Sequence, residues 1–164
     1  ENMGVPQTRH RVFFVATRLD FDLSNIDLTF NYKPITFGDI MTGQHTVESG
    51  KIAEVGKLSN EEDNLLSDTM MRLYNKRTYF SERIVYRNKI CPTITAGGSD
   101  IWIENWGAKI NQNEIINAQT FPQDYNYCKQ KPKYICGMSV PPIMIKRLMT
   151  RLIESGLYNY KLNR

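Results

Sequence analysis

Two arginines set two positions apart have the chemistry to bind an anion or a nucleobase. They are Arg9 and Arg11, within the run Gly-Val-Pro-Gln-Thr-Arg-His-Arg-Val at residues 4–12. Side chains of equal parity share one face of a strand, so we expect both guanidinium groups to point the same way and His10 to point away. A guanidinium presents a planar fork of donors that binds phosphate or carbonyl oxygens. The run is therefore able to contact a phosphate or a base carbonyl, although two surface arginines at the start of a strand would give the same pattern.

Three further runs combine Gly or Pro with hydroxyl and amide side chains. They are Pro-Thr-Ile-Thr at 92–95, Gln-Thr-Phe-Pro-Gln-Asp-Tyr at 119–125 and Gly-Met-Ser-Val-Pro-Pro at 137–142. The chain has no Gly-x-Gly-x-x-Gly pattern, no phosphate loop and no Gly-x-Ser-x-Gly elbow. Its three cysteines and two histidines lack the close-paired spacing that holds zinc, so we predict no metal site.

The four runs, in this order, resemble conserved segments in the C-terminal half of DNA (cytosine-5) methyltransferases. The run at 4–12 is similar to that family's Gln-x-Arg-x-Arg segment, and 92–95 resembles the Pro-Thr-Ile near the end of its target-recognition domain. The run at 119–125 resembles the Phe-Pro helix end, and 137–142 the closing Gly-Asn-Ser-Val-Pro-Pro. The resemblance implies an enzyme of restriction–modification or phage type that transfers a methyl group from S-adenosylmethionine to cytosine C5.

The resemblance also implies roles for the residues in these runs. An enzyme that modifies a base carbon extrudes the base from the duplex. Arg11 is then expected to contact the O2 atom of the flipped cytosine and the adjoining backbone, and Arg9 to support the pocket and a phosphate. Gln7 is expected to order the turn or the flipped-base pocket. Around the cofactor we expect Ser139 together with its neighbours Met138 and Val140, although Met138 stands where the family usually has Asn.

The resemblance places target recognition between Thr17 and Gly107, so DNA contacts are expected there. The basic and flexible residues proposed for DNA binding are Arg77, Arg83, Arg87, Lys89, Thr95, Gly97, Gly98 and Ser99. Base-edge contacts give sequence specificity, whereas phosphate contacts only position the duplex. The sequence does not divide these residues between the two kinds of contact.

Three segments of the family are missing from the chain: a Pro-Cys loop, a Glu-Asn-Val segment with the family's spacing, and a Phe-x-Gly-x-Gly turn. The family reaction needs the cysteine thiolate of that loop to attack C6 of cytosine. We therefore expect a C-terminal portion of an enzyme, inactive alone, whose partners are double-stranded DNA and an N-terminal catalytic part that binds most of the cofactor. Two alternatives stay open: a non-catalytic DNA-binding module or split-enzyme subunit, and a tRNA cytosine-5 methyltransferase fragment.

Composition sets the broad class of the chain. The 164 residues carry 21 Lys+Arg and 17 Asp+Glu, a net charge of +4, which is compatible with a polyanionic partner without establishing one. No apolar run approaches the roughly 18 residues of a membrane span. No signal peptide is visible and cysteines are sparse, so we expect a reducing, cytoplasmic location associated with the nucleoid.

The elements that must position these residues follow from apolar spacing. We predict a buried strand at 11–16, a helix from Ser59 to about Lys76, a strand-rich region at 77–104, a helix at 111–119 and an amphipathic helix at 140–153 that ends at Gly156. The stretches 19–58 and 122–133 are predicted to be mostly loops, with short strands in the first.

The predicted fold class is α+β, with a small mixed recognition domain of short strands and helices. Residues 1–18 are expected to end a Rossmann-like catalytic domain that is otherwise absent, 19–133 to form the recognition domain, and 134–164 to return to the catalytic domain as a closing turn and helix. The apolar faces of 11–16 and 140–153 would then lack their sheet, so we expect self-association or disorder at these ends.

Overall fold

The computed structural model describes residues 2–16, 26–43 and 45–157. Along these residues the elements are α1 (Phe37–Ile40), α2 (Lys51–Lys57), α3 (Leu66–Tyr74), β1 (Arg83–Val85), β2 (Ile101–Ile103), β3 (Ala108–Lys109), α4 (Gln112–Gln119), α5 (Pro132–Met138) and α6 (Pro142–Leu152), which continues into a π-helical turn at Ile153–Leu157. The boundary expected near residue 18 lies outside the described residues.

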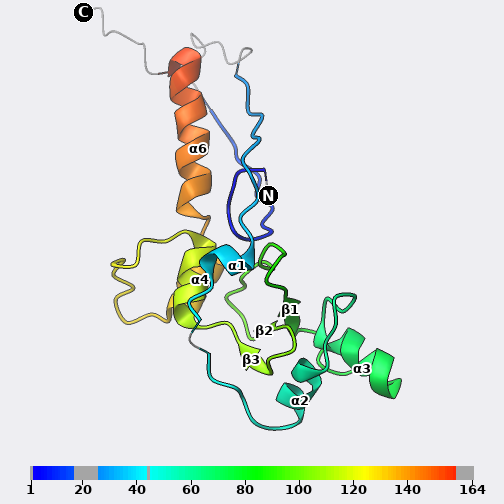
Figure 1. Ribbon diagram of the computed structural model, residues 1–164. Coiled ribbons are helices and arrows are strands. Elements are labelled where there is room, and N and C mark those ends of the chain that lie inside the picture. Colours follow the sequence, from blue (N-terminus) through cyan, green and yellow to red (C-terminus); the bar gives the residue numbers. More distant parts are fainter. Residues whose placement is uncertain (1, 17–25, 44, 158–164) are drawn as a thin grey trace, which may run out of the picture.

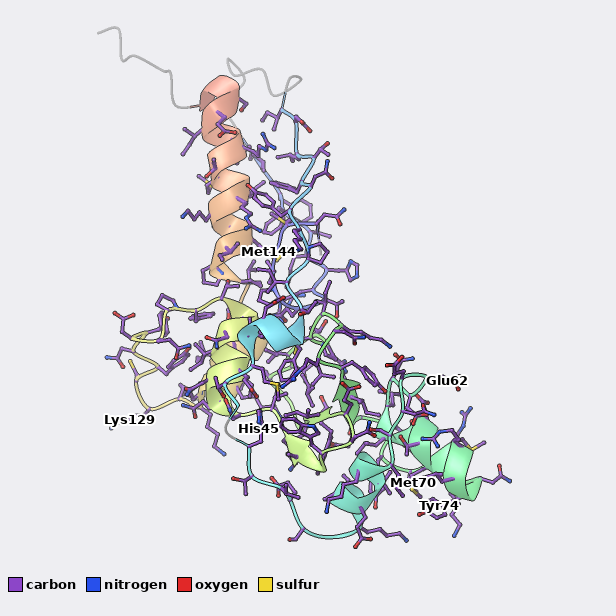
Figure 2. The ribbon with its side chains drawn as sticks, in the orientation of Figure 1. His45, Glu62, Met70, Tyr74, Lys129 and Met144 are labelled. Atoms are coloured by element: carbon purple, nitrogen blue, oxygen red, sulfur yellow. The ribbon has the colours of Figure 1, made fainter. Side chains whose placement is uncertain are left out.

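The described part has two regions, which we call the body and the stalk. The body comprises residues 33–141, with α1 to α5 and the sheet, whereas the stalk comprises α6 and the extended segments 10–16 and 26–32 (Figure 1). Met144 lies at the stalk's base, and Met70 and Tyr74 lie at the far end of the body (Figure 2). The Arg147 guanidinium stacks 3.5 Å from the Tyr32 ring centroid and so joins α6 to segment 26–32.

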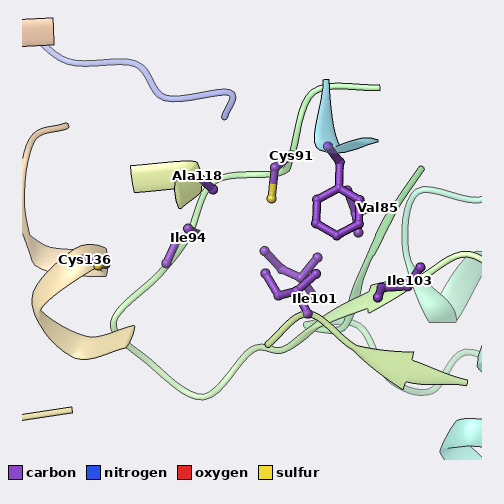
Figure 3. Close-up of a cluster of buried hydrophobic side chains, with 9 residues drawn as sticks. Val85, Cys91, Ile94, Ile101, Ile103, Ala118 and Cys136 are labelled. Atoms are coloured by element: carbon purple, nitrogen blue, oxygen red, sulfur yellow. The ribbon is translucent and has the colours of Figure 1, made fainter. Parts of the chain in front are cut away.

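The sheet separates two cores inside the body. Its order is β1-β2-β3, with β1 parallel to β2 and β2 antiparallel to β3. Because alternate side chains of a strand point to opposite faces, Ile101 and Ile103 of β2 enter one core and Trp102 enters the other. The first core also holds Cys91 and Ile94 (Figure 3). The body is therefore a mixed α/β unit whose central strand is buried on both faces.

Two of the expected helices are confirmed, and local signals explain them. In α4 the Asn111 side chain accepts a hydrogen bond from the Glu114 amide at 3.0 Å, and the Glu114 carboxylate accepts one from the Asn111 amide at 2.9 Å. This reciprocal capping fixes where the helix begins. Helix α6 begins with Pro142 at its first position, where a missing N–H costs nothing. It does not end at Gly156, since the π-helical turn runs through that residue to Leu157.

The helix expected from Ser59 begins at Leu66 instead. The Ser59 hydroxyl donates to the Gly56 carbonyl at 2.8 Å and so serves the end of α2 rather than the start of α3. Residues 59–65 turn because Asp63 is buried there, accepts hydrogen bonds from Thr69 and the Asn60 amide, and pairs with Arg72 at 2.7 Å. A tertiary ion pair therefore overrides the apparent capping box.

Other expected elements also differ from the structure. Helices α1 and α2 lie in the stretch expected to be loops and short strands, and α5 occupies residues expected to form a loop and a turn. Residues 11–16 form no strand, and none of the backbone pairings found among the described residues involves them. No Rossmann-like sheet is formed by the described residues.

Candidate functional site

Arg9 lies at the point where the chain's distinctive runs meet. Its side chain is only 5% exposed. One terminal nitrogen donates to the Ile94 carbonyl at 2.9 Å, and the other donates to the Gly137 carbonyl at 2.8 Å and the Ser139 carbonyl at 2.5 Å. Burial, helped by the charge of Arg11, lowers the Arg9 pKa from its ordinary value. The guanidinium thus links the Arg9 segment to two others, which lie about 85 and 130 residues further along the chain.

Gln7 completes this tie from the same segment. It is fully buried, and its amide nitrogen donates to the Ala118 carbonyl at 2.9 Å and the Gln119 side-chain oxygen at 2.5 Å. Its amide oxygen accepts from the Ile94 N–H at 3.3 Å. Gln119 in turn donates to the Ser139 carbonyl at 3.1 Å. We call these five residues, Gln7, Arg9, Ile94, Gln119 and Ser139, the motif junction.

Arg11 lies in a different environment two residues further on. Its side chain is exposed and donates at 2.7 Å to the carbonyl of His10, its own neighbour. Arg9, His10 and Arg11 all line a cleft of about 650 Å³ between the stalk segments, together with Asn2, Met3, Phe13, Val15, Leu28, Phe30, Met144 and Leu148. The expectation that the His10 side chain faces away from the two arginines stays a prediction.

The turn expected to approach the cofactor ends α5. The Ser139 hydroxyl donates to the Ile135 carbonyl at 2.6 Å, and the Ser139 amide donates to the same carbonyl at 3.0 Å. Met138 is 66% exposed, and Val140 is half-buried. Of these three side chains, Met138 is the one most open to a ligand.

Gly137 explains why this helix lies so close to the 92–95 run. A Cβ atom at this position would lie 2.1 Å from the Ala96 amide nitrogen and 2.4 Å from the Thr95 carbonyl carbon. Backbone atoms offer no flexible end that moves aside, so only glycine permits this contact. Gly137 thus brings α5 directly onto the backbone of Thr95 and Ala96.

Two of the expected DNA-binding cations share a second cleft. Arg83 is half-buried and donates to the Thr93 carbonyl at 2.6 Å, while Lys89 donates to the Glu61 carbonyl at 3.0 Å and lies over the Tyr86 ring. They line a cleft of about 360 Å³ with Thr8, Asn64, Leu65, Ile84, Tyr86, Ile90, Pro92 and Thr93. The motif run that holds Arg9 thus borders this cleft through Thr8.

The remaining expected contacts lie apart from that cleft. Arg87 is exposed, and its guanidinium lies 3.6 Å from the Met41 sulfur. Arg77 is exposed beyond the end of α3. The loop from Thr95 to Ser99 closes on itself through a 2.8 Å bond between the Thr95 and Ser99 hydroxyls. A Cβ added at Gly97 or Gly98 meets nothing within 4 Å, so the loop tip is open to solvent.

Two cysteines of the body are unsuited to nucleophilic chemistry. Cys91 and Cys136 are fully buried. Burial raises the pKa of Cys91 to about 12 and also raises that of Cys136. A thiol attacks as its thiolate, which burial disfavours. Across residues 2–16, 26–43 and 45–157, no group of three His, Cys, Asp or Glu side chains is placed to hold a metal ion.

Sequence reasoning missed one buried polar group that shapes the site's surroundings. Glu114 is fully buried and accepts from His45 at 2.7 Å and from the Thr42 amide at 3.0 Å. His45 packs edge-on against Trp106 (Figure 2 labels His45). The capping signal of Glu114 was visible in the sequence, but its contacts with residues about 70 positions earlier had no local signature.

The described part thus combines a mixed α/β unit with a buried motif junction and a cationic cleft. A family model described as C-5 cytosine-specific DNA methylase matches residues 1–154, and the chain belongs to this family. The resemblance drawn from the four runs is thereby confirmed. A search of curated proteins and a search of solved structures returned no match. None of the helices in the described part is both long and apolar enough to span a bilayer.

Proposed function

We propose that the chain supplies the target-recognition and C-terminal part of a DNA (cytosine-5) methyltransferase. In this proposal residues 1–18 end the catalytic domain, 19–133 recognise DNA, and 134–164 return to the catalytic domain. The observation that carries it is the contrast between two neighbouring arginines. Arg9 donates to the carbonyls of Ile94, Gly137 and Ser139, while Arg11 stays exposed in the adjoining cleft.

Arg11 is proposed to contact the flipped cytosine. One nitrogen of its guanidinium donates to the His10 carbonyl, and the other N–H groups can donate to a base carbonyl or a phosphate. Arg9 and Gln7 are proposed to hold the segment in place, because their polar atoms bond the 94, 119 and 139 segments. This division gives a rigid base beneath an exposed donor, as a pocket for an extruded base requires.

The DNA backbone is proposed to lie along the cleft of Arg83 and Lys89. Both side chains bond carbonyls through one nitrogen and keep further donors, so each can face a phosphate without losing its support. The open tip at Gly97–Gly98 is proposed to approach a groove, with Thr95 and Ser99 fixing its base. Arg77 and Arg87 are proposed as outlying phosphate contacts.

The family uses S-adenosylmethionine, and this chain is proposed to touch it only at the end of α5. The exposed Met138 side chain and the half-buried Val140 fit an apolar part of the cofactor. The Ser139 hydroxyl already bonds Ile135, so its contact would use a remaining lone pair. The cofactor donates the methyl group; the residues of this chain exclude water and hold the closing turn in place.

The isolated chain is proposed to be inactive in methyl transfer. Its sequence contains no Pro-Cys pair, and Cys91 and Cys136 are buried thiols with raised pKa values. Incubation of the chain with DNA and radiolabelled S-adenosylmethionine should leave the DNA unlabelled. Label in DNA with the chain alone would overturn the assignment of the nucleophile to a separate catalytic part.

The proposed contact of Arg11 is tested with duplexes that differ in one base. A cytosine opposite an abasic site is cheaper to extrude than a paired cytosine, so the chain should bind that duplex more tightly. Arg11→Ala should remove this preference, whereas Lys129→Ala, a cation on the exposed 122–131 loop (Figure 2), should keep it. A preference that survives Arg11→Ala would refute the role of Arg11.

The same assay separates the proposal from its alternatives. Competition by duplex DNA but not by tRNA supports a DNA enzyme, whereas preferential binding of tRNA favours the tRNA-methylating alternative. A salt-dependent affinity with no preference for the unpaired cytosine favours a DNA-binding module without a base pocket.

A further inference from the structure

One lysine of α5 holds the end of the Thr95–Ser99 loop. The Lys133 ammonium donates to the Ser99 carbonyl at 2.8 Å and to one carboxylate oxygen of Asp100 at 2.6 Å. The other Asp100 oxygen pairs with Lys109 of β3 at 2.9 Å. Lys133 therefore connects the helix, the loop and, through Asp100, the sheet.

The start of the same loop is held by the same helix. Gly137 packs directly on the backbone of Thr95 and Ala96, where even a methyl group does not fit. Lys133 and Gly137 are four residues apart in α5 and so lie on one face of the helix. The two ends of the loop are thus fixed by adjacent turns of one helix, while a Cβ added at Gly97 or Gly98 between them would meet nothing within 4 Å.

The Lys133 ammonium is already paired with the Asp100 carboxylate. Burial alone would raise the pKa of Asp100, but the hydrogen bonds from Lys133 and Lys109 outweigh it and lower the pKa. A small cavity of about 50 Å³ lies beside these groups, with Ile94 and Ile101 in its wall. The carboxylate is therefore charged at neutral pH and needs its cations in place.

We propose that Lys133 is a positioning residue for DNA binding, which orders the Ala96–Ser99 loop by clamping its end to α5. The inference rests on the proposed function, in which this loop approaches a DNA groove. A glycine pair gives the loop tip free access but also high conformational entropy. Fixing both stems removes part of that entropy before DNA arrives, which strengthens binding without any contact between Lys133 and DNA.

The test compares Lys133→Met with Lys129→Met and Lys133→Arg. Lys129 is an exposed cation on the loop before α5, so its variant removes the same charge without touching the clamp (Figure 2). Hydrogen exchange at the Gly97–Asp100 amides should become about fivefold faster in Lys133→Met alone. Affinity for a mixed-sequence DNA duplex should fall about three- to tenfold, and Lys133→Arg should restore most of it.

The dependence of affinity on salt distinguishes positioning from direct contact. A lysine that neutralises a phosphate contributes about one counterion to the slope of log K against log salt, so its loss lowers the slope by about 0.9. For Lys133→Met the slope should equal that of Lys129→Met. A lower slope would make Lys133 a phosphate contact and overturn the inference, as would unchanged exchange and affinity.

A second variant guards against a misfolded first one. Asp100→Asn keeps the bond from Lys133 to the Ser99 carbonyl but weakens both ion pairs, so exchange should quicken by less than in Lys133→Met. Failure of the wild-type chain to bind DNA would refute the proposed function. The exchange measurements on the loop need no DNA, so they would still decide whether Lys133 orders it.

Discussion

The body and the stalk differ in which side chains they bury. At the motif junction a charged arginine is buried and every contact it makes is to another segment, whereas in the stalk Phe14 is 94% exposed and Val12 78% exposed. Carbonyls of the body replace water around the Arg9 guanidinium, which reaches them from a segment outside residues 33–141. In the described part of the chain, Phe14 and Val12 are both more exposed than any large apolar side chain of the body, where the highest value is 66% at Met138. The stalk therefore leaves these apolar groups open to solvent.

The largest effect should come from the centre of the motif junction. Arg9→Ala leaves the carbonyls of Ile94 and Gly137 without their guanidinium and should lower the free energy of unfolding by about 4 kcal/mol. Arg11→Ala, two residues away, should change it by less than about 0.5 kcal/mol, because the side chain is exposed. Urea unfolding measures both. Equal losses would show that the two arginines are not divided between structure and ligand.

The next largest change in the free energy of unfolding should come from the packing of α5. Gly137→Ala places a methyl group 2.1 Å from the Ala96 nitrogen and should cost about 3 kcal/mol, because backbone must move. Gly98→Ala is the matched control: its Cβ meets nothing within 4 Å, and stability should hold within about 0.5 kcal/mol. Thermal unfolding of the pair tests this. A tolerated Gly137→Ala would mean that α5 and the Thr95–Ala96 backbone separate at little cost.

Local signals predicted some of this fold, and tertiary contacts determined the rest. Asn111 and Glu114 cap α4 through neighbours three residues apart, so the sequence alone located that helix. Ser59 offers the same kind of signal, yet the pairing of Asp63 with Arg72 moves the start of α3. A capping pattern is informative only where no stronger distant partner competes for the same residues.

The site shows the same limit. The family resemblance located the runs that meet at Arg9. The runs alone did not reveal that Arg9 is buried and bonds carbonyls of distant segments, whereas Arg11 is exposed. The placement of Lys133 against Ser99 likewise depends on residues more than 30 positions apart, which no local pattern joins. The residue types predicted the chemistry, but only the structure showed which residues bond other segments and which stay exposed.

The body and the stalk also differ in how much an ion pair contributes to stability, and this difference is smaller. Asp63 is buried in the body; burial tends to raise its pKa, but hydrogen bonds from Arg72, the Asn60 amide and Thr69 outweigh this and lower it. Its pairing thus stabilises the fold fully above the ordinary pKa of 3.8 and is lost as the pH falls through the lower folded pKa.

The corresponding variants separate a buried pair from an exposed one. Asp63→Asn should cost about 2 kcal/mol at pH 7 and flatten the loss of stability between about pH 5 and 2. In the stalk, Glu154 lies 3.5 Å from Arg151 in an exposed pair, so Glu154→Gln should leave the pH profile unchanged. Denaturation monitored across this pH range compares them. Parallel profiles for wild type and Asp63→Asn would exclude Asp63 as a source of the acid sensitivity.

The smallest effect on stability belongs to the stalk, and there the change in association is the informative result. Besides Phe14, three apolar side chains of α6 and the turn that follows it are at least 40% exposed: Ile145, Met149 and Ile153. Phe14→Ser combined with Met149→Ser should leave the free energy of unfolding within about 0.5 kcal/mol of wild type.

The same double variant should nevertheless convert self-associated chain to monomer in light scattering, because exposed apolar surface of this extent drives association. Leu148→Ser is the contrasting variant, since Leu148 is buried inside the stalk and its loss should destabilise α6 itself. A wild-type chain that stays monomeric at high concentration would show that the stalk needs no cover. The exposed apolar side chains of the stalk would then not drive self-association of the chain.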